Sequence, residues 1–206
     1  GSGYRIDYAL VGYLTQALYD YQNKYFFSAS YRRDGSSRFA PETRWGNFWS
    51  LGTSWRIDRE EFMASTSDWL SALTLKMSYG AQGNDNLGTY YASKGLYTIV
   101  SNLGENALVS DRMATPNLKW ETTTSWNVGF DFGFLKDRIT GSFDYYTRQT
   151  KDLIATVPAA AGTTFDRNIT TNVGNVDSQG VEFSLNATPI QTKDWNWDLS
   201  FNMTWQ

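Results

Sequence analysis

Few side chains in this 206-residue sequence are suited to catalysis, because it contains no cysteine and no histidine. Their absence excludes disulfides, zinc sites and nucleophilic catalysis by Cys/His or Ser/His groups. Carboxylates remain, and Glu60 and Glu61 form an adjacent pair. Neighbours on a strand point to opposite faces, so the two make a poor acid/base pair and are expected at a solvated surface. We therefore predict no catalytic residue, no cofactor and no enzymatic activity.

A second group, Asn84, Asp85 and Asn86, carries oxygen ligands of the kind that calcium prefers. Its spacing does not match a calcium-binding loop, and its Gly-rich surroundings favour a solvated turn. We therefore predict no metal site. Tryptophan rings offer another chemistry, since they stack on sugars, and Trp45 and Trp120 lie next to long predicted loops. These two are weak candidates for contact with a substrate.

The elements that carry these side chains follow from an alternation of apolar and polar residues. In residues 195–205, WNWDLSFNMTW, every odd position is apolar and every even position is polar. This period of two indicates an extended strand with two different faces. A strand of about 11 residues tilted by about 45° spans roughly 25 Å, the height of the apolar band on a membrane barrel. About eight strands are predicted, at 5–19, 25–31, 47–57, 71–79, 126–134, 139–147, 181–188 and 195–205.

The phase of each predicted strand assigns its side chains to lipid or to the interior. Phe130 falls on the apolar face and Asp131 on the polar face. Five tryptophans also fall on the apolar face, where we expect lipid or the membrane interface rather than sugar: Trp49, Trp55, Trp195, Trp197 and Trp205.

The predicted connections alternate between short and long. Residues 20–24, 135–138 and 191–194 are short turns, whereas the other links run from about ten to roughly forty residues. This is the layout of an outer-membrane barrel with short periplasmic turns and long extracellular loops. The link at 57–69 is an exception, and 59–70 could form a short helix. Both chain ends are then expected on the extracellular side, so we expect a segment from within a longer barrel.

Composition is compatible with this fold class, an all-β antiparallel transmembrane barrel. Aromatic residues make up 17% of the chain, mean hydropathy is −0.48, and no apolar run approaches the roughly 18 residues of a transmembrane helix. A net charge of −3 gives no electrostatic case for binding nucleic acid. The first ten residues lack the basic and apolar regions of a signal peptide.

Several motifs, in order, resemble the SusC/RagA group of TonB-dependent outer-membrane transporters from Bacteroidota. The specific pieces are DGSSRF at 34–39, NLKWETT at 117–123 and NVGNVDSQGVE at 172–182, and the likeness spans nearly the whole chain. The resemblance implies a roughly 22-stranded barrel with a plug inside. Residues 1–206 would then be a partial barrel domain that lacks the plug, the remaining strands and the amino-terminal region that contacts TonB.

The resemblance also implies a role in nutrient uptake across the bacterial outer membrane. Members of this group import oligosaccharides or peptides, with a SusD-like surface lipoprotein over the barrel and energy from TonB. Within DGSSRF, Arg38 is a weak candidate for contact with ligand or lipoprotein. The alternative, which we favour, is a loop fold-back in which Asp34 bonds nearby amides and Arg38 pairs with a carboxylate.

A different class of protein remains open at this point. A soluble, exported, carbohydrate-binding β-sandwich would also be rich in aromatic residues. It would bury Phe130, Leu185 and Phe201 together between two stacked sheets. An outer-membrane enzyme would need a pair of carboxylates, and the sequence offers no plausible pair.

Overall fold

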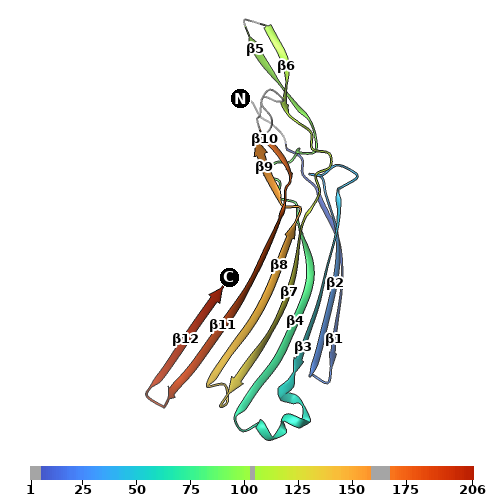
Figure 1. Cartoon of the computed structure of the whole chain (residues 1–206). Helices are drawn as coiled ribbons and strands as arrows, with labels where there is room; N and C mark the ends of the chain where they lie inside the picture. The colour runs from blue at the N-terminus through green and yellow to red at the C-terminus, as the bar shows by residue number, and fades with distance from the viewer. Residues whose placement is uncertain (1–5, 103–104, 159–167) are drawn as a thin grey trace.

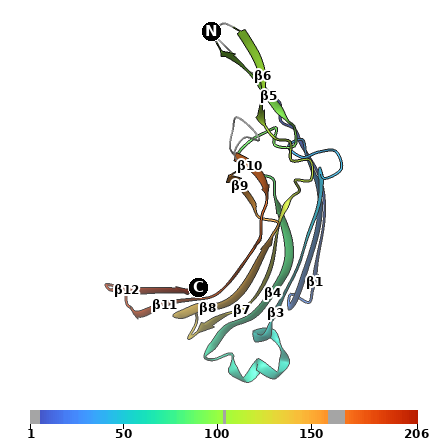
Figure 2. The same ribbon diagram turned by 45° about the horizontal axis from the view of Figure 1, so that its top comes forward.

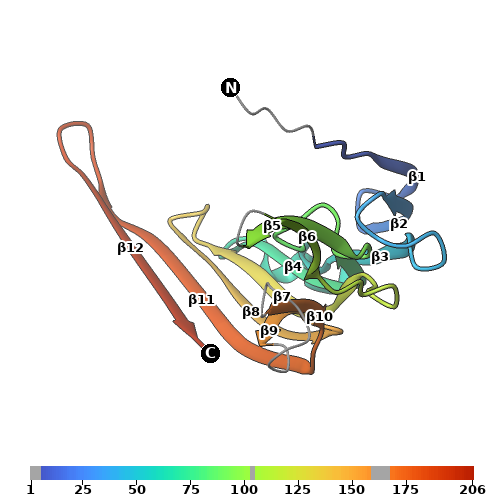
Figure 3. The same cartoon turned by 90° about the horizontal axis from the view of Figure 1, so that it is seen from above.

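The computed structural model describes residues 6–102, 105–158 and 168–206. Its main element is one antiparallel sheet of eight strands in the order β1-β2-β3-β4-β7-β8-β11-β12 (Figure 1). The strands are β1 (Leu10–Tyr21), β2 (Tyr25–Ser36), β3 (Trp45–Arg56), β4 (Leu70–Asn84), β7 (Glu121–Phe134), β8 (Ile139–Lys151), β11 (Asn175–Gln191) and β12 (Asn196–Trp205). Seen from above, the sheet is a curved wall with β1 and β12 at its two edges (Figure 3).

All eight predicted strands are present, and most are longer than predicted. The segment predicted at 25–31 extends to Ser36, and the one predicted at 71–79 extends to Asn84. These extensions are polar at their loop ends, where pairing with a neighbouring strand satisfies the backbone although the apolar alternation has ended. The predicted strand at 5–19 begins later, at Leu10, and residue 5 lies outside the described residues.

Two hairpins occur within links that were predicted as long loops. β5 (Leu96–Asn102) pairs with β6 (Glu105–Arg112), and β9 (Ile154–Pro158) pairs with β10 (Asn168–Asn172). The β5–β6 hairpin projects well beyond the ends of the wall strands (Figures 1 and 2). No strands were predicted in these long loops, because hairpins this short carry too few alternating residues to stand out among Gly, Asn and Ser.

The opposite end of the wall carries the short turns. Gln22 and Asn23 both have positive φ, 56° and 53°, as the two central residues of a type I′ turn do, and the Lys24 amide donates to the Tyr21 carbonyl at 3.1 Å. The link after β3 instead contains two 3-10 helices, η1 (Ile57–Arg59) and η2 (Glu61–Thr66). They replace the single short helix expected at 59–70. Among the described residues, no helix is long and apolar enough to cross a membrane.

Candidate functional site

The eight-stranded sheet has one apolar and one polar face, because the ladder keeps neighbouring strands in phase. Leu75 lies opposite Trp55 on one side and Phe130 on the other, and Phe130 lies opposite Phe143. The same rows continue to Phe183 and then to the last strand, β12. Neighbouring strands therefore add to a continuous apolar surface, as the predicted phases require.

The β-sandwich alternative is wrong for this chain. Phe130, Leu185 and Phe201 lie on the same face of a single sheet. Phe130 is 39% exposed and Phe201 is 53% exposed, so neither lies in a dry centre between sheets. Within the described ranges, the sheet topology contains no second large sheet to cover this face. An apolar surface of this extent is the surface that a membrane barrel turns to lipid.

Tyrosine and tryptophan side chains gather in two bands on the apolar face, with phenylalanine pairs such as Phe130–Phe143 between them. Near the loop end, Trp49 meets Tyr79 with ring centroids 5.1 Å apart, and Trp126 meets Tyr145 at 6.0 Å. Near the turn end, ring pairs recur at 5.8–6.2 Å and involve Tyr25–Trp55 and Trp69–Phe134. Two aromatic bands that flank an apolar strip are typical of the two membrane–water interfaces of a barrel.

The polar face is held together by hydrogen bonds between small side chains on neighbouring strands. The cross-strand pairs lie 2.7–3.1 Å apart and comprise Ser30–Ser50, Ser78–Asn127, Ser142–Ser184 and Asn186–Ser200. Charged groups join this network through Lys76, whose Nζ lies 2.7 Å from Asp131 and 3.6 Å from Asp144. A wettable surface of hydroxyl, amide and charged groups thus lines the face opposite the apolar one.

A loop junction covers the end of this polar face, and Arg38 lies at its centre. The Arg38 guanidinium sits between the rings of Tyr8 and Tyr90, at 4.7 and 4.8 Å from their centroids. It donates to the backbone oxygen of Asp85 at 2.8 Å and lies 3.8 Å from the Asp85 carboxylate. That carboxylate also accepts from Tyr8 and Ser36. Burial, followed by the bond to Asp85, raises the pKa of Tyr8.

This geometry confirms one part of the predicted fold-back and corrects another. Arg38 does pair with a carboxylate, but Asp34 bonds the Arg32 guanidinium at 2.7 Å instead of nearby amides. Asn84 and Asn86 form the expected exposed turn, with the Asn86 amide donating to Asn84 Oδ1 at 3.0 Å. Asp85, between them, belongs instead to the loop junction, through its contacts with Arg38, Tyr8 and Ser36.

The tryptophan candidates for substrate contact lie in two different places. Trp120 is 7% exposed, donates to the Arg44 carbonyl at 2.9 Å and packs against Phe39 and Phe48 in a small core. That core also contains Leu87, Ala92 and Leu118. Trp45 lies on the apolar face, outside the wall, and stacks on Tyr13 at 6.3 Å. The structure does not bring Trp45, Trp120 and Arg38 together, and substrate contact by any of them stays a prediction.

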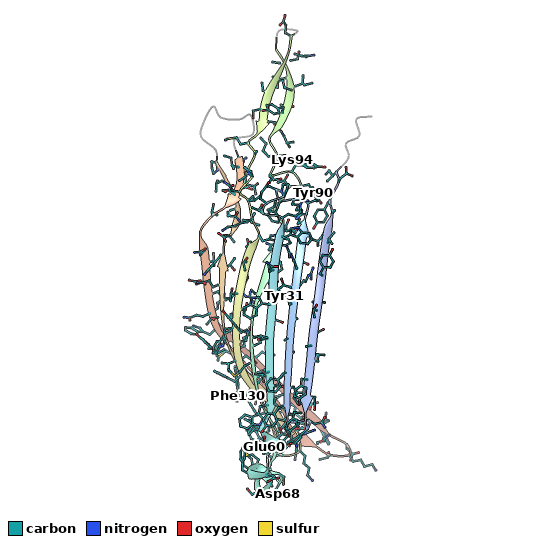
Figure 4. The ribbon with its side chains drawn as sticks, turned by 90° about the vertical axis from the view of Figure 1, so that its right-hand side faces the viewer. Tyr31, Glu60, Asp68, Tyr90, Lys94 and Phe130 are labelled. Atoms are coloured by element: carbon teal, nitrogen blue, oxygen red, sulfur yellow. The ribbon has the colours of Figure 1, made fainter. Side chains whose placement is uncertain are left out.

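Glu60 accepts hydrogen bonds from three side chains, a role that was not predicted from the sequence. Glu60 lies at the turn end of the wall (Figure 4). Its carboxylate accepts from Tyr25 at 2.5 Å, from Trp55 at 2.9 Å and from Lys24 at 3.2 Å. The predicted solvated surface is therefore wrong for Glu60, whose side chain is 13% exposed. The hydrogen bonds from Tyr25 and then Trp55 lower the pKa of Glu60. Only the register of β2 and β3 brings these partners to the linker, so no local motif marks them.

Comparison with known proteins agrees with this architecture. Residues 3–206 match the family described as TonB dependent receptor-like, beta-barrel. The TonB-dependent receptor SusC of Bacteroides thetaiotaomicron is 42% identical over 203 residues, covering 95% of this chain and 20% of SusC. The TonB-dependent receptor P39 of Formosa agariphila is 36% identical over 203 residues, covering 96% of this chain and 19% of P39.

Solved structures show the same arrangement of strands. The RagAB peptide transporter superposes with a TM-score of 0.87 at 32% identity, covering 96% of this chain and 22% of the transporter chain. The siderophore receptor PirA of Pseudomonas aeruginosa shares the fold, with a TM-score of 0.61 at 18% identity, covering 96% of this chain and 34% of PirA. The chain spans about a fifth of the length of the curated relatives. It belongs to the TonB-dependent receptor β-barrel family, and its eight long strands form part of the wall of an outer-membrane barrel.

Proposed function

We propose that residues 1–206 are part of the barrel of a TonB-dependent importer that takes up oligosaccharides or peptides. The observation that carries this proposal is the phase-locked pair of faces, apolar toward lipid and polar toward a lumen. Similarity to the RagAB peptide transporter supports a peptide cargo, and the resemblance to the SusC/RagA group implies oligosaccharides as the other class. In a complete barrel the lumen would hold a plug, and TonB would act through a region outside this chain.

The polar face offers a place for cargo or plug next to the loop junction. A hollow of about 510 Å³ lies between β1 and β7 on this side. Its lining combines hydrogen-bonding groups with aromatic and aliphatic ones, among them Ser30, Arg32, Asn127, Phe48 and Leu14. A mixed lining suits sugars and peptides, which present both hydroxyl or amide groups and apolar faces.

The loops beyond the wall are the proposed contact surface for a SusD-like lipoprotein. The β5–β6 hairpin projects from this end and exposes Tyr97, Ile99 and Leu108, each by 67–70%. An isolated two-stranded hairpin has little stability of its own, so an outside partner would stabilise it. In this arrangement Arg38 and Trp120 are proposed to support or touch cargo and lipoprotein rather than to catalyse a reaction, whereas Trp45 lies on the outer face, away from the lumen.

Uptake by intact cells tests the proposal. A strain that lacks the full-length receptor should lose uptake of labelled oligosaccharides or peptides, and loss of TonB should have the same effect. The lack of native cysteine in this chain allows a matched test of the two faces. A cysteine at Asn127 should react with a membrane-impermeant maleimide, whereas one at Phe130 should not. Unchanged uptake in both strains would refute transport, and equal labelling would refute the assignment of the faces.

A further inference from the structure

Arg33 is a cation on the face of the wall that otherwise meets lipid. Its position in the ladder, opposite Tyr13 and Asn47, places it in the same outward row as those residues. The Arg33 guanidinium lies 5.2 Å from the centre of the Trp45 ring, which in turn stacks on Tyr13. Arg33 is exposed, and its neighbour Arg32 points to the other face, where it pairs with Asp34.

The height of Arg33 is that of the outer membrane interface. Arg33 lies eight residues along β2 from Tyr25, which belongs to the aromatic band at the turn end. Eight residues at about 3.3 Å per residue, tilted by about 40°, rise roughly 20 Å, close to the height of the apolar band. Tyr31, two residues before Arg33, already lies well toward the loop end compared with Phe130 (Figure 4). A charge at this level is tolerated because it meets headgroups rather than acyl chains.

Within the described part of the chain, no carboxylate pairs with Arg33. Its outward neighbours are Tyr13, Tyr31, Asn47 and Trp45, and none of these is acidic. Tyr31 donates its hydroxyl proton to Asn47 Oδ1 at 2.8 Å, which leaves the Asn47 amide nitrogen available as a donor on the residue that pairs with Arg33. Gly35 makes this arrangement possible, because a Cβ there would lie 2.9 Å from the Trp45 ring that crosses it. The result is a set of hydrogen-bond donors on an aromatic platform, with no anion supplied by the protein.

We propose that Arg33, Asn47 and Trp45 form a binding site for the phosphorylated headgroup of a lipid in the outer leaflet. The planar guanidinium binds phosphate oxygens in a bidentate manner, Asn47 donates to a third acceptor, and the Trp45–Tyr13 stack supports the apolar part of the headgroup. Charge complementarity commits the site to an anionic headgroup. The proposal rests on the proposed place of this chain in the wall of an outer-membrane barrel.

Lipid binding by the intact, detergent-solubilised receptor tests the site. The probe is monophosphoryl lipid A, compared with the same lipid after removal of its phosphate and with inorganic phosphate alone, each followed by native mass spectrometry. Arg33→Gln should weaken binding of the phosphorylated lipid about tenfold or more, the factor that 1.4 kcal/mol represents and that one charge-assisted bond readily exceeds. Arg148→Gln removes an exposed cation from the polar face and should leave binding unchanged. Arg33→Lys should bind more tightly than Arg33→Gln but less tightly than the unmodified receptor, because lysine keeps the charge and lacks the planar guanidinium that binds phosphate in a bidentate manner.

The outcomes separate this site from the proposed function. Equal retention of the phosphorylated and dephosphorylated lipid, or equal loss with Arg33→Gln and Arg148→Gln, would overturn the headgroup site. So would an Arg33→Gln receptor that keeps its lipid but no longer co-purifies with a surface lipoprotein. Heat-modifiable migration and cargo uptake, measured on the same variants, report barrel assembly and transport independently of lipid retention.

Discussion

Phe130→Arg tests the assignment of the two faces most directly. Phe130 lies four residues from Trp126 and four from Phe134 on β7, so it is midway between the two aromatic bands. An arginine at the bilayer midplane of a barrel costs about 2–4 kcal/mol. The change also removes the stacked ring pair with Phe143 at 5.6 Å, worth about 0.5–1.5 kcal/mol. We therefore expect a loss of roughly 3–5 kcal/mol in the free energy of folding into a bilayer.

Two matched substitutions separate the effects of membrane depth and sheet face on a charge from the effect of losing an aromatic ring pair. Phe134→Arg also breaks a stacked pair, with Trp69 at 5.8 Å, but places the charge at the interface, where the charge itself costs only about 0–1 kcal/mol. Asp131→Asn changes a charge on the polar face and weakens the half-exposed pair with Lys76, which contributes about 0–1 kcal/mol. Folding into vesicles, followed by urea titration and heat-modifiable gel migration, measures all three.

The relative sizes of the three losses in folding free energy test the assignment of the two faces. The reasoning requires Phe130→Arg to be clearly the most damaging, with Phe134→Arg and Asp131→Asn well below it. If Asp131→Asn were as damaging as Phe130→Arg, the polar face would not be the aqueous one. If Phe130→Arg and Phe134→Arg were equal, the aromatic bands would not mark the two interfaces.

Two further predictions concern the ends of the wall. Arg38→Ala should destabilise the loop junction by roughly 2–3 kcal/mol, because it removes two cation–π contacts and the link to Asp85. Hydrogen exchange should therefore accelerate in both loops, 37–44 and 85–92, while β2 stays protected; acceleration in only one loop would contradict the junction. Because the pKa of Glu60 lies below its usual 4.5, its bonds stabilise the 57–69 linker fully above that pH, and the stabilisation is lost as pH falls through the lowered value. Limited proteolysis of the linker should therefore increase on acidification below pH 4.5, and Glu60→Gln should reduce that dependence; a variant with the wild-type pH profile would show that Glu60 is not the responsive group.

Much of the wall could be predicted from the sequence, because the residues that decide which face of a strand is apolar are close neighbours along the chain. Alternation in 126–134 or 195–205 fixes the faces of each strand, and the ladder only has to keep neighbouring strands in phase. The predicted apolar positions of Trp49, Trp55, Trp197 and Trp205 follow from this and agree with the register, whereas Trp195 lies in the turn before β12.

The ends of the wall could not be predicted because their contacts are long-range. Glu60 meets Tyr25 across 35 positions, and Arg38 meets Asp85 across 47. Neither pair belongs to a short motif, and each forms only after the strands between the partners have paired. For the same reason Trp120 looked like a free loop ring, although it is part of a core built from three separate segments.

The two longest loop segments, 85–120 and 152–174, each begin and end next to residues that pair directly with each other in the sheet. Asn84 pairs with Glu121, and Lys151 pairs with Asn175, so β4–β7 and β8–β11 close beneath the segments between them. The cost of closing a loop grows only slowly with its length. Insertions, deletions or exchanges within these segments can therefore change the loops without moving one strand against another.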